Sequence, residues 1–490
     1  MRKGSLLLVI LLALTACSST TKQSFPDAPN DLSTLTWTTC HDKFQCATLK
    51  VPIDYSDESV GQFDIAVIRY RDPNQNNRIG SLVVNPGGPG VSGVEYTLNA
   101  QYIVNPDVLE RYDIVGFDPR GVGASSPITC LSDVEQEASL ISDPKPDNEA
   151  EYAQTLKDTQ DFIDKCIAKT PNLAHFSTRD AAKDMELLRQ ALGDKQLNYL
   201  GFSYGTYLGT LYAQLFPDKV GRFVLDGAVD PQISFEQQTK VQAVAFDQAL
   251  ANFITDCHKQ KNCPLPKDAT PAFFTELFNK VSQTPLTVGD RQITEGLVVT
   301  GTASALYDDV SGWPSLRIAI QEGQNGDGTT FAQLADSYNA RESDGRFKNN
   351  ENDANVIINC LDWQQSKTND QIKSAADSFK KLASVFGPYV AYSGITCNML
   401  NEKIHAPQWI NNKISFNTAT PVLVIGTTQD PATPYEWAKS LNSYIHGSHL
   451  ITLKGEGHTG YGRGSACTDD AVDSYLINGT TPAKNLICTQ

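Results

Sequence analysis

Hydrophobic and polar positions follow two different rhythms along the chain. Up to about residue 230, short apolar runs rich in β-branched residues alternate with amphipathic stretches of helical period. Alternation at 63–70 predicts a half-buried strand near a sheet edge, whereas the continuous runs 81–85 and 112–117 suit strands buried on both faces of a parallel sheet. This order of elements predicts an α/β fold. The same reasoning predicts a helix at 177–192, a strand at 197–200, a helix at 204–216 and a strand at 222–225.

The rhythm changes further along the chain, where helical patterns dominate and strand runs are few. Strand patterns return at 421–426 and 449–453, and a last helix is predicted at 469–478. We therefore expect one α/β core that is interrupted by a helical cap lying over the sheet. The expected boundaries are 37–230 and 406–490 for the two parts of the core and 231–405 for the cap.

The composition fits a folded protein without a nucleic-acid partner. Of the 490 residues, 40% are hydrophobic and 20% are charged, which excludes wholesale disorder. The 56 Asp and Glu residues outnumber the 40 Lys and Arg residues, so the formal charge is −16. Because phosphate binding needs a surplus of basic side chains, this charge argues against nucleic-acid binding.

The first residues have the pattern of an export signal. A basic start precedes an apolar run at 6–14, which is shorter than the roughly 20 residues that span a bilayer. Such a pattern is typical of a secretory signal peptide. Residues 14–17 resemble the lipobox of bacterial lipoproteins, so we expect a signal peptide over 1–16, acylation of Cys17, a tether over 17–36 and membrane anchoring on the extracytoplasmic side. A plain signal peptide with an incidental cysteine is the alternative.

The remaining cysteines predict disulfide bonds, because an even number in an exported chain indicates a disulfide set. Pairing between neighbours in the sequence is the simplest arrangement, since each loop is then local, although connectivity does not follow from sequence. No pair has the C-x₂-C spacing of a zinc site, so we expect no metal. The ten candidates are Cys40, Cys46, Cys130, Cys166, Cys257, Cys263, Cys360, Cys397, Cys467 and Cys488.

The motif Gly-Phe-Ser-Tyr-Gly at 201–205 supplies a candidate nucleophile, Ser203. A predicted strand precedes it and a predicted helix follows, which is the context of the nucleophile elbow. Glycines flank the serine because the tight turn leaves no room for side chains. The helix N-terminus beneath it favours negative charge that develops on a substrate oxygen.

A serine nucleophile needs a base and an acid, which in this fold follow it in the order acid, then histidine. His458 lies in a glycine-lined loop after the last predicted strand, and Asp430 follows the predicted strand before that one. Catalytic residues of parallel sheets gather in the loops after the carboxyl ends of strands. We therefore expect Asp430 and His458 at one sheet edge, with Asp362 and Glu456 as competing acids.

The oxyanion hole needs two backbone N–H groups, one from the residue after the nucleophile and one from an early loop. Tyr204 provides the first, and Gly88 in the loop Asn-Pro-Gly-Gly-Pro-Gly at 85–90 is the candidate for the second. Gly88, Gly90 and Gly93 also spell the G-x-G-x-x-G pattern of dinucleotide sites. A proline inside the turn and the lack of a clear helical run afterwards argue against a nicotinamide, so we expect no cofactor.

Five motifs occur together in this chain, at 85–90, 116–123, 201–206, 226–227 and 455–458. Together they resemble the tripeptidyl-aminopeptidase-like exopeptidases, which are α/β-hydrolases related to prolyl iminopeptidases. The similarity extends from about Cys40 to Cys488. Asn85-Pro departs from the His-Gly of prolyl iminopeptidases and leans toward the tripeptidyl branch. The resemblance implies an α/β-hydrolase fold and removal of short peptides from free N-termini, without a metal or organic cofactor.

Such an exopeptidase has to bind the α-ammonium group of its substrate. An acidic side chain of the cap is suited to this by charge-assisted hydrogen bonding. Asp362 is the candidate, because a disulfide at the nearby Cys360 would fix its position. A capping or surface role for Asp362 is the alternative.

These observations predict a membrane-anchored, extracytoplasmic serine exopeptidase that acts on peptides with a free N-terminus. Ser203 is expected to attack, His458 to move the proton and Asp430 to orient the imidazole. Two alternatives remain: the same machinery acting on esters or lipids, and a non-catalytic envelope lipoprotein. The oligomeric state does not follow from the sequence.

Overall fold

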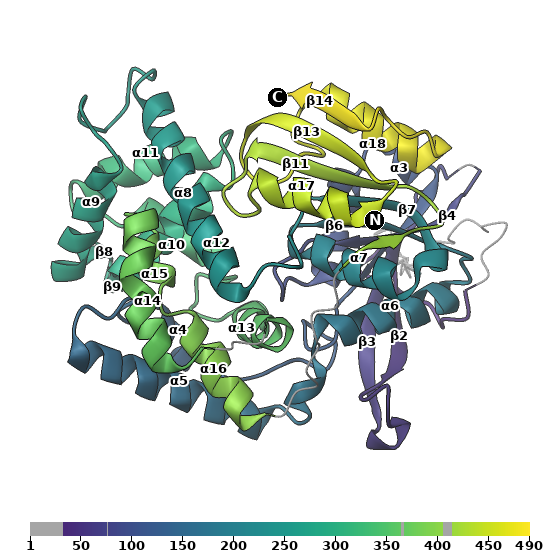
Figure 1. Ribbon diagram of the computed structural model, residues 1–490, viewed down its shortest axis with the longest axis horizontal. Coiled ribbons are helices and arrows are strands. Elements are labelled where there is room, and N and C mark those ends of the chain that lie inside the picture. The colour runs from purple at the N-terminus through teal and green to yellow at the C-terminus, as the bar shows by residue number, and fades with distance from the viewer. Residues whose placement is uncertain (1–32, 76, 364–366, 405–413) are drawn as a thin grey trace, which may run out of the picture.

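A ten-stranded sheet forms the centre of the protein (Figure 1). The computed structural model describes residues 33–75, 77–363, 367–404 and 414–490, so the expected signal peptide and Cys17 lie outside the described residues. The strand order is β1-β2-β3-β5-β4-β6-β7-β11-β13-β14. These strands are β1 (Thr38–Cys40), β2 (Phe44–Pro52), β3 (Gln62–Tyr70), β4 (Gly80–Asn85), β5 (Tyr112–Phe117), β6 (Leu197–Phe202), β7 (Val220–Asp226), β11 (Val422–Gln429), β13 (His449–Glu456) and β14 (Asn485–Thr489).

Most of the sheet is parallel, as the buried apolar runs predict. The pairs from β5 through β4, β6, β7, β11 and β13 to β14 are parallel, whereas β1, β2 and β3 pair antiparallel at one edge. The predicted strands are confirmed, including the place of β3 near an edge. Strands β1, β2 and β14 are not among the strands that the hydrophobic pattern predicts. Two small pairs lie outside this sheet: β8 (Leu286–Val288) with β9 (Arg291–Ile293), and β10 (Phe416–Asn417) with β12 (Ile445–His446).

Helices cover both faces of the sheet. Alternate residues of β4 point to opposite faces: Val83 belongs to the same buried cluster as residues of α6 (Thr178–Leu192) and α7 (Tyr204–Leu215), whereas Leu82 and Val84 belong to the cluster on the other face, with residues of α3 (Pro106–Leu109) and α18 (Ala466–Asn478). Within the described residues, seven helices cover the two faces. Those that precede β11 in the chain are α1 (Gly93–Thr97), α2 (Ala100–Ile103), α3 (Pro106–Leu109), α6 (Thr178–Leu192) and α7 (Tyr204–Leu215), and those that follow it are α17 (Tyr435–Tyr444) and α18 (Ala466–Asn478). Three short 3₁₀ turns are η1 (Glu58–Val60), η2 (Leu173–His175) and η3 (Pro217–Lys219).

A second group of helices lies beside the sheet, at the left in Figure 1, and we call it the helical region. It has its own core, in which Phe253, Phe274 and Phe331 are buried. It comprises α8 (Phe235–Cys257), α9 (Ala272–Gln283), α10 (Glu295–Leu306), α11 (Gly312–Gly323), α12 (Thr329–Tyr338), α13 (Glu351–Asp362), α14 (Asn369–Leu382), α15 (Gly387–Val390) and α16 (Gly394–Lys403), together with α4 (Asp133–Leu140) and α5 (Glu149–Lys169).

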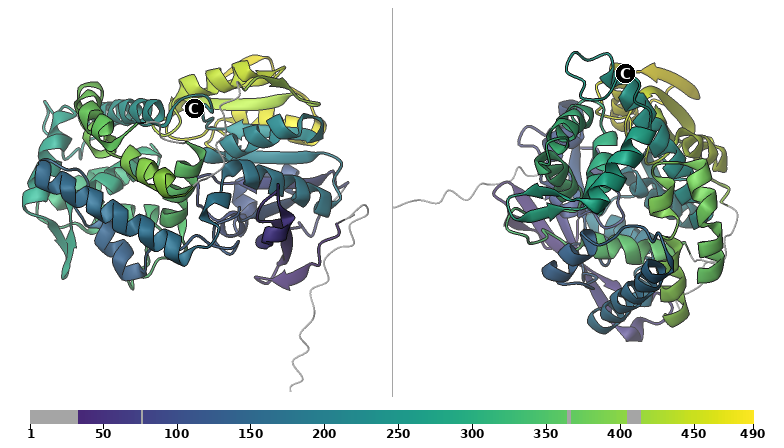
Figure 2. Two further views of the ribbon diagram at one scale, coloured as in Figure 1. Left: turned by 60° about the horizontal axis from the view of Figure 1, so that its bottom comes forward. Right: turned by 90° about the vertical axis from the view of Figure 1, so that its left-hand side faces the viewer.

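Helices α4 and α5 come from a stretch that the sequence pattern assigned to the first part of the core. In the structure they lie with the helical region, where α5 packs against α16 (Figure 2). Lys403 of α16 pairs with Asp164 of α5 across this contact. The helical region is therefore assembled from two separate insertions into the sheet, and their joining could not be deduced from local periodicity.

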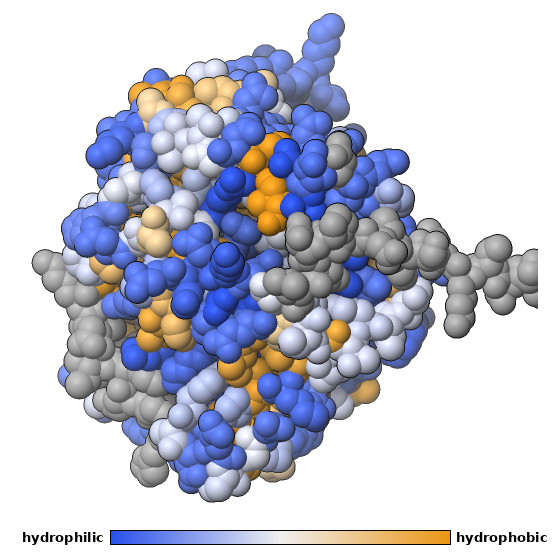
Figure 3. Space-filling model, turned by 90° about the vertical axis from the view of Figure 1, so that its right-hand side faces the viewer, coloured by the Kyte–Doolittle hydropathy of each residue, from blue (hydrophilic) through white to orange (hydrophobic). Residues whose placement is uncertain are grey.

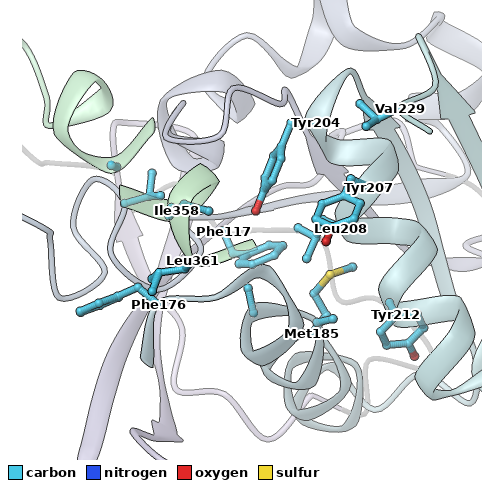
Figure 4. Packing of buried hydrophobic residues seen from close by; sticks show 14 of the residues in the cluster. Phe117, Phe176, Met185, Tyr204, Tyr207, Leu208, Tyr212, Val229, Ile358 and Leu361 are labelled. Atoms are coloured by element: carbon cyan, nitrogen blue, oxygen red, sulfur yellow. The ribbon is translucent and has the colours of Figure 1, made fainter. Parts of the chain in front are cut away.

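Helix α13 connects the helical region to the core of the sheet. Its residues Ile358 and Leu361 belong to the same buried cluster as Tyr204, Tyr207 and Met185 from the helices on the sheet (Figure 4). The ring of Trp363, just after α13, stacks on that of Tyr207 with centroids 4.4 Å apart. A buried apolar interface thus fixes α13 against the helix that follows Ser203.

Five disulfide bonds join neighbouring cysteines in the sequence, which confirms the simplest pairing. Two of them hold the outermost strands: Cys40–Cys46 joins β1 to β2, and Cys467–Cys488 joins α18 to β14. The other three, Cys130–Cys166, Cys257–Cys263 and Cys360–Cys397, involve α5, α8, α13 and α16 of the helical region.

The visible surface is mostly hydrophilic. On the face that Figure 3 shows, hydrophobic side chains form several small patches between hydrophilic ones, apart from the part covered by grey atoms. Across the described ranges, no helix combines the length and the apolar character needed to cross a membrane.

Candidate active site

Ser203 occupies the tight turn between β6 and α7. Its backbone has φ 54° and ψ −125°, a combination that non-glycine residues rarely adopt and that the elbow imposes. A Cβ at Gly201 would lie 2.6 Å from the carbonyl oxygen of Gly205, and one at Gly205 would lie 2.8 Å from Asn85 Oδ1. Both flanking glycines are therefore required by close packing, as the motif predicts.

His458 and Asp430 form a hydrogen-bonded pair at the carboxyl ends of β13 and β11. The His458 Nδ1 atom lies 3.0 Å from Asp430 Oδ1 and 2.9 Å from Oδ2. Asp430 is only 3% exposed, and it accepts further hydrogen bonds from the N–H groups of Ala432, Thr433 and Thr459. A carboxylate held in this way keeps the Nδ1 tautomer of the imidazole fixed and leaves Nε2 available for proton transfer.

The two competing acids have other partners. The Glu456 carboxylate accepts hydrogen bonds from the Asn252 amide at 3.1 Å. The Asp362 carboxylate accepts a bond from the Thr178 N–H at 2.8 Å. Of the acids considered from the sequence, it is Asp430 that contacts His458.

Asp226 and Gly227, at the end of β7, lie against the turn of Ser203 and against the His458 ring, respectively. The Ser203 N–H donates to the carbonyl oxygen of Asp226 at 2.8 Å, and a Cβ at Gly227 would lie 3.2 Å from His458 Cε1. Within the described residues, the Ser203 hydroxyl makes no hydrogen bond, so its contact with His458 is not formed here. Such bonds are often long in unliganded enzymes and tighten with substrate.

The loop after β4 packs directly onto the elbow. A Cβ at Gly87 would lie 2.9 Å from the Cβ of Ser203 and 3.3 Å from the backbone nitrogen of Tyr204. The N–H of Gly87 is occupied by Asn85 Oδ1 at 3.0 Å. Those of Gly88 and Tyr204 have no partner among the described residues. An oxyanion hole requires two such unoccupied donors, and the contact of the neighbouring Gly87 with the elbow is compatible with this role for Gly88 and Tyr204.

A residue of the helical region, Tyr307, contacts His458, and the sequence gave no reason to choose this residue. The N–H of His458 donates to the carbonyl oxygen of Tyr307 at 2.9 Å, and the two rings meet edge to face with centroids 5.2 Å apart. Thr433 also lies 3.3 Å from His458 Nδ1 through its hydroxyl. Thr433 is close to Asp430 in sequence, so its contact with the site could have been predicted. Tyr307 lies about 150 residues from His458 and belongs to no recognisable motif, so its contact could not.

Asp362 lies at the end of α13 and caps the start of α6. It accepts hydrogen bonds from both the N–H and the hydroxyl of Thr178, whose hydroxyl also contacts that of Tyr204. Burial raises the pKa of Asp362 to about 7. The capping role that the sequence left as an alternative is thus present, and both donors belong to the protein itself.

Glu351, at the other end of α13, is an acid that the sequence reasoning did not single out. A Cβ at Gly90 would lie 2.6 Å from the Glu351 carbonyl oxygen, so α13 begins against the loop that carries Gly88. Burial and the neighbouring Glu95 raise the pKa of Glu351 to about 7. No donor in the described part of the chain reaches its carboxylate. Glu95, in contrast, pairs with Lys348 at 2.9 Å.

Throughout the described ranges, no group of three or more His, Cys, Asp or Glu side chains is arranged to hold a metal ion. The glycines of the G-x-G-x-x-G pattern lie instead against protein atoms. A Cβ at Gly93 would lie 2.1 Å from the Phe117 carbonyl oxygen. This glycine serves close packing between α1 and β5.

The chain is similar in sequence to known hydrolases. A model of the alpha/beta hydrolase fold matches residues 80–463. Serine protease Hip1 of Mycobacterium tuberculosis is 36% identical over 463 residues, which cover 90% of this chain and 87% of that protein. Carboxylesterase B of the same species is 34% identical over 483 residues, covering 94% and 91%. Tripeptidyl aminopeptidase of Streptomyces lividans is 31% identical over 463 residues, covering 91% and 83%.

Proposed function

Because the chain belongs to the alpha/beta hydrolase fold family, we propose that it is a serine peptidase that releases short peptides from free N-termini. The observation that carries this proposal is the hydrogen-bonded His458–Asp430 pair, together with the strained elbow of Ser203 and the packing of the loop after β4 onto that elbow. The similarity to a serine protease and to a tripeptidyl aminopeptidase supports the substrate class and agrees with the resemblance found in the motifs.

In the proposed mechanism, His458 Nε2 takes the proton of the Ser203 hydroxyl as its oxygen attacks the scissile carbonyl carbon. The oxyanion that forms is held by the N–H groups of Gly88 and Tyr204, and Asp430 stabilises the imidazolium. The proton passes to the leaving amine, the C–N bond breaks and an acyl-enzyme remains. Water then attacks this ester with His458 as base, which releases the N-terminal fragment and restores Ser203.

We assign recognition of the substrate amine to the helical region, with Glu351 in preference to Asp362. The Asp362 carboxylate is already bonded to both donors of Thr178. The Glu351 carboxylate has no donor among the described residues, and the backbone of Glu351 lies against Gly90 in the loop that carries Gly88. A substrate ammonium group would offer it both hydrogen bonds and opposite charge. Asp362 remains the second candidate.

The direct test is to compare tripeptidyl aminomethylcoumarins with and without an N-acetyl group. The wild type is expected to cleave the free peptides and to lose most activity on the acetylated ones. Ser203→Ala should abolish turnover and fluorophosphonate labelling while the circular dichroism spectrum stays unchanged. Full activity of this variant, or absence of labelling in the wild type, would refute the proposal and leave the non-catalytic alternative.

An esterase function is the second candidate, because the chain is also similar to a carboxylesterase. The same triad and oxyanion hole would serve an ester, whose leaving group needs no amine recognition. Equal turnover of acetylated and free substrates, with faster cleavage of p-nitrophenyl esters than of peptides, would favour the esterase. A strong preference for the free N-terminus would exclude it as the main activity.

We further propose that the protein is exported and anchored to the membrane through acylated Cys17. The five disulfides support an oxidising compartment, since such bonds are rare in reducing cytosol. Metabolic labelling with an alkyne fatty acid should mark the wild type and not Cys17→Ala. Equal labelling, or equal release of both proteins from washed membranes, would contradict the anchor.

A further inference from the structure

Asp226, the last residue of β7, is a buried acid that the proposed mechanism does not use. It is 0% exposed. Its Oδ1 accepts the N–H of Gly460 at 2.9 Å, and its Oδ2 accepts that of Tyr461 at 2.8 Å. Gly460 and Tyr461 belong to the loop that carries His458. A buried carboxylate is costly unless it is hydrogen-bonded, so this pair of bonds accounts for its burial.

The main chain of the same residue holds the nucleophile. The carbonyl oxygen of Asp226 accepts the N–H of Ser203 at 2.8 Å. Asp226 therefore contacts the serine turn through its backbone and the histidine loop through its side chain. Asp430 contacts the imidazole itself and cannot set the distance between the two loops, because it is attached to β11 and not to the elbow.

We propose that Asp226 is a positioning residue that sets the distance between Ser203 and the His458 loop. Its two carboxylate oxygens accept two consecutive N–H groups, an arrangement that an amide cannot reproduce because its NH₂ group would face one of the donors. A shift of the loop moves Nε2 relative to the Ser203 hydroxyl, and a displacement of about 1 Å costs on the order of 10²-fold in rate.

The charged surroundings of Asp226 give the proposal a second observable. Burial raises the pKa of Asp226 to about 6, and the nearby Asp430 adds to this, whereas the bonds from Tyr461 and Gly460 and the proximity of His458 act in the opposite direction. The Tyr96 hydroxyl is a further titratable group near it. An ionised Asp226 favours a positive charge on the nearby imidazole, so removal of the Asp226 charge should move the acid limb of the kcat/KM profile to lower pH.

The inference rests on the proposed serine hydrolase mechanism, and the test uses probes that do not depend on the natural substrate. The full-length protein is assayed with p-nitrophenyl acetate and with a fluorophosphonate. An unlabelled wild type would refute the proposed function. A labelled wild type with an unaffected Asp226 variant would refute the present inference alone.

Asp226→Asn is expected to lower kcat by about 10- to 100-fold with KM nearly unchanged, because the loop is displaced and substrate binding is not. The acid limb of the kcat/KM profile should move to lower pH. Asp247→Asn is the matched control, since this half-buried carboxylate also accepts two consecutive N–H groups, from Val385 at 3.1 Å and Phe386 at 2.9 Å, within the helical region. It should keep the wild-type kcat and acid limb.

Asp226→Glu separates charge from position, because it retains the carboxylate and displaces its oxygens. It should lower kcat without moving the acid limb downward. Equal effects of Asp226→Asn and Asp247→Asn, or a wild-type kcat and profile in a folded Asp226→Asn, would overturn the inference. Failure of both Asp226 variants to fold would also overturn it, since Asp226 would then serve the fold and not the spacing of the triad.

Discussion

The sheet and the helical region reach the active site in different ways. The sheet supplies the groups that we propose to react, on short loops after parallel strands, and these loops are fixed by hydrogen bonds such as those that Asp430 and Asp226 accept from the backbone. The helical region supplies groups that surround them. The Tyr307 carbonyl oxygen accepts the N–H of His458, and the backbone of Glu351 lies against Gly90 in the loop after β4.

The difference separates chemistry from recognition. A loop packed as tightly as Gly87 against Ser203 leaves no freedom to change without loss of the reaction. The Glu351 carboxylate has no such constraint among the described residues, so its replacement should change which substrates bind. Variants in the sheet should therefore alter kcat, and variants in the helical region should alter KM.

The largest effect is expected from the sheet. Asp430→Asn should lower kcat by roughly 10⁴-fold, because the amide favours the wrong tautomer of His458. The measurement is steady-state hydrolysis of a free tripeptidyl aminomethylcoumarin. Glu456→Gln is the control. Glu456 lies two residues before His458, but its carboxylate bonds to Asn252, so the kcat of this variant should stay close to that of the wild type. A large loss in the control and a small one in Asp430→Asn would reverse the assignment.

A smaller effect on a different parameter is expected from Glu351→Gln. It should raise KM for free tripeptides by roughly 10- to 100-fold, the value of one charge-assisted bond, and leave kcat nearly unchanged. Acetylated substrates should show no change. Glu342→Gln serves as control, because Glu342 pairs loosely with Arg346 at 3.7 Å on the surface. If Glu351→Gln leaves KM unchanged and Asp362→Asn raises it, the amine binds at Asp362.

The pH dependence of KM sharpens this distinction. Since the pKa of Glu351 is raised to about 7, its carboxylate is ionised above that pH and becomes neutral as the pH falls through it. Because the α-ammonium of the substrate has a pKa of about 8 and is itself partly deprotonated at pH 8, KM for free tripeptides should rise by roughly fourfold between pH 8 and pH 6. The profile of Glu351→Gln should lack this rise. A wild-type KM that is constant over this range would argue against Glu351 as the amine ligand.

The smallest effect on catalysis is expected from a disulfide of the helical region. The pair Cys360→Ser and Cys397→Ser should lower the free energy of unfolding by about 2–4 kcal/mol, because the bond closes a local loop. Hydrolysis of p-nitrophenyl acetate, which needs no amine recognition, should persist below the melting temperature. Thermal unfolding and ester assays measure the two quantities. Loss of ester hydrolysis in the folded variant would show that the two regions are not separable.

The sequence predicted the sheet region better than the helical region, for physical reasons. The strands β4 and β5 are continuous apolar runs, and Ser203, Asp430 and His458 each follow such a strand, so local patterns locate them. Helices α4 and α5 join the helical region through contacts such as Asp164–Lys403, which link residues more than 200 positions apart. No period or motif records a contact of that kind.

The same limit explains which site residues were missed. Tyr307 and Glu351 meet the site through tertiary packing alone, and Asp226 appeared in a motif without a role. Asp362 was chosen for its place near Cys360, and that disulfide is present. Its carboxylate nonetheless faces Thr178, because the side-chain direction depends on how α13 packs against α6. The sequence therefore locates the segment that carries Asp362 but does not reveal that Thr178 is its hydrogen-bond partner.

The placement of two disulfides has a consequence for handling the protein. Each outermost strand of the central sheet is held by its own disulfide bond: Cys40–Cys46 holds β1 at one edge, and Cys467–Cys488 holds β14 at the other. An unprotected strand edge presents free N–H and C=O groups to other chains and promotes aggregation. Reducing agents would loosen both edges at once. We therefore expect production in an oxidising host, and storage without thiols, to decide whether the purified protein stays monodisperse.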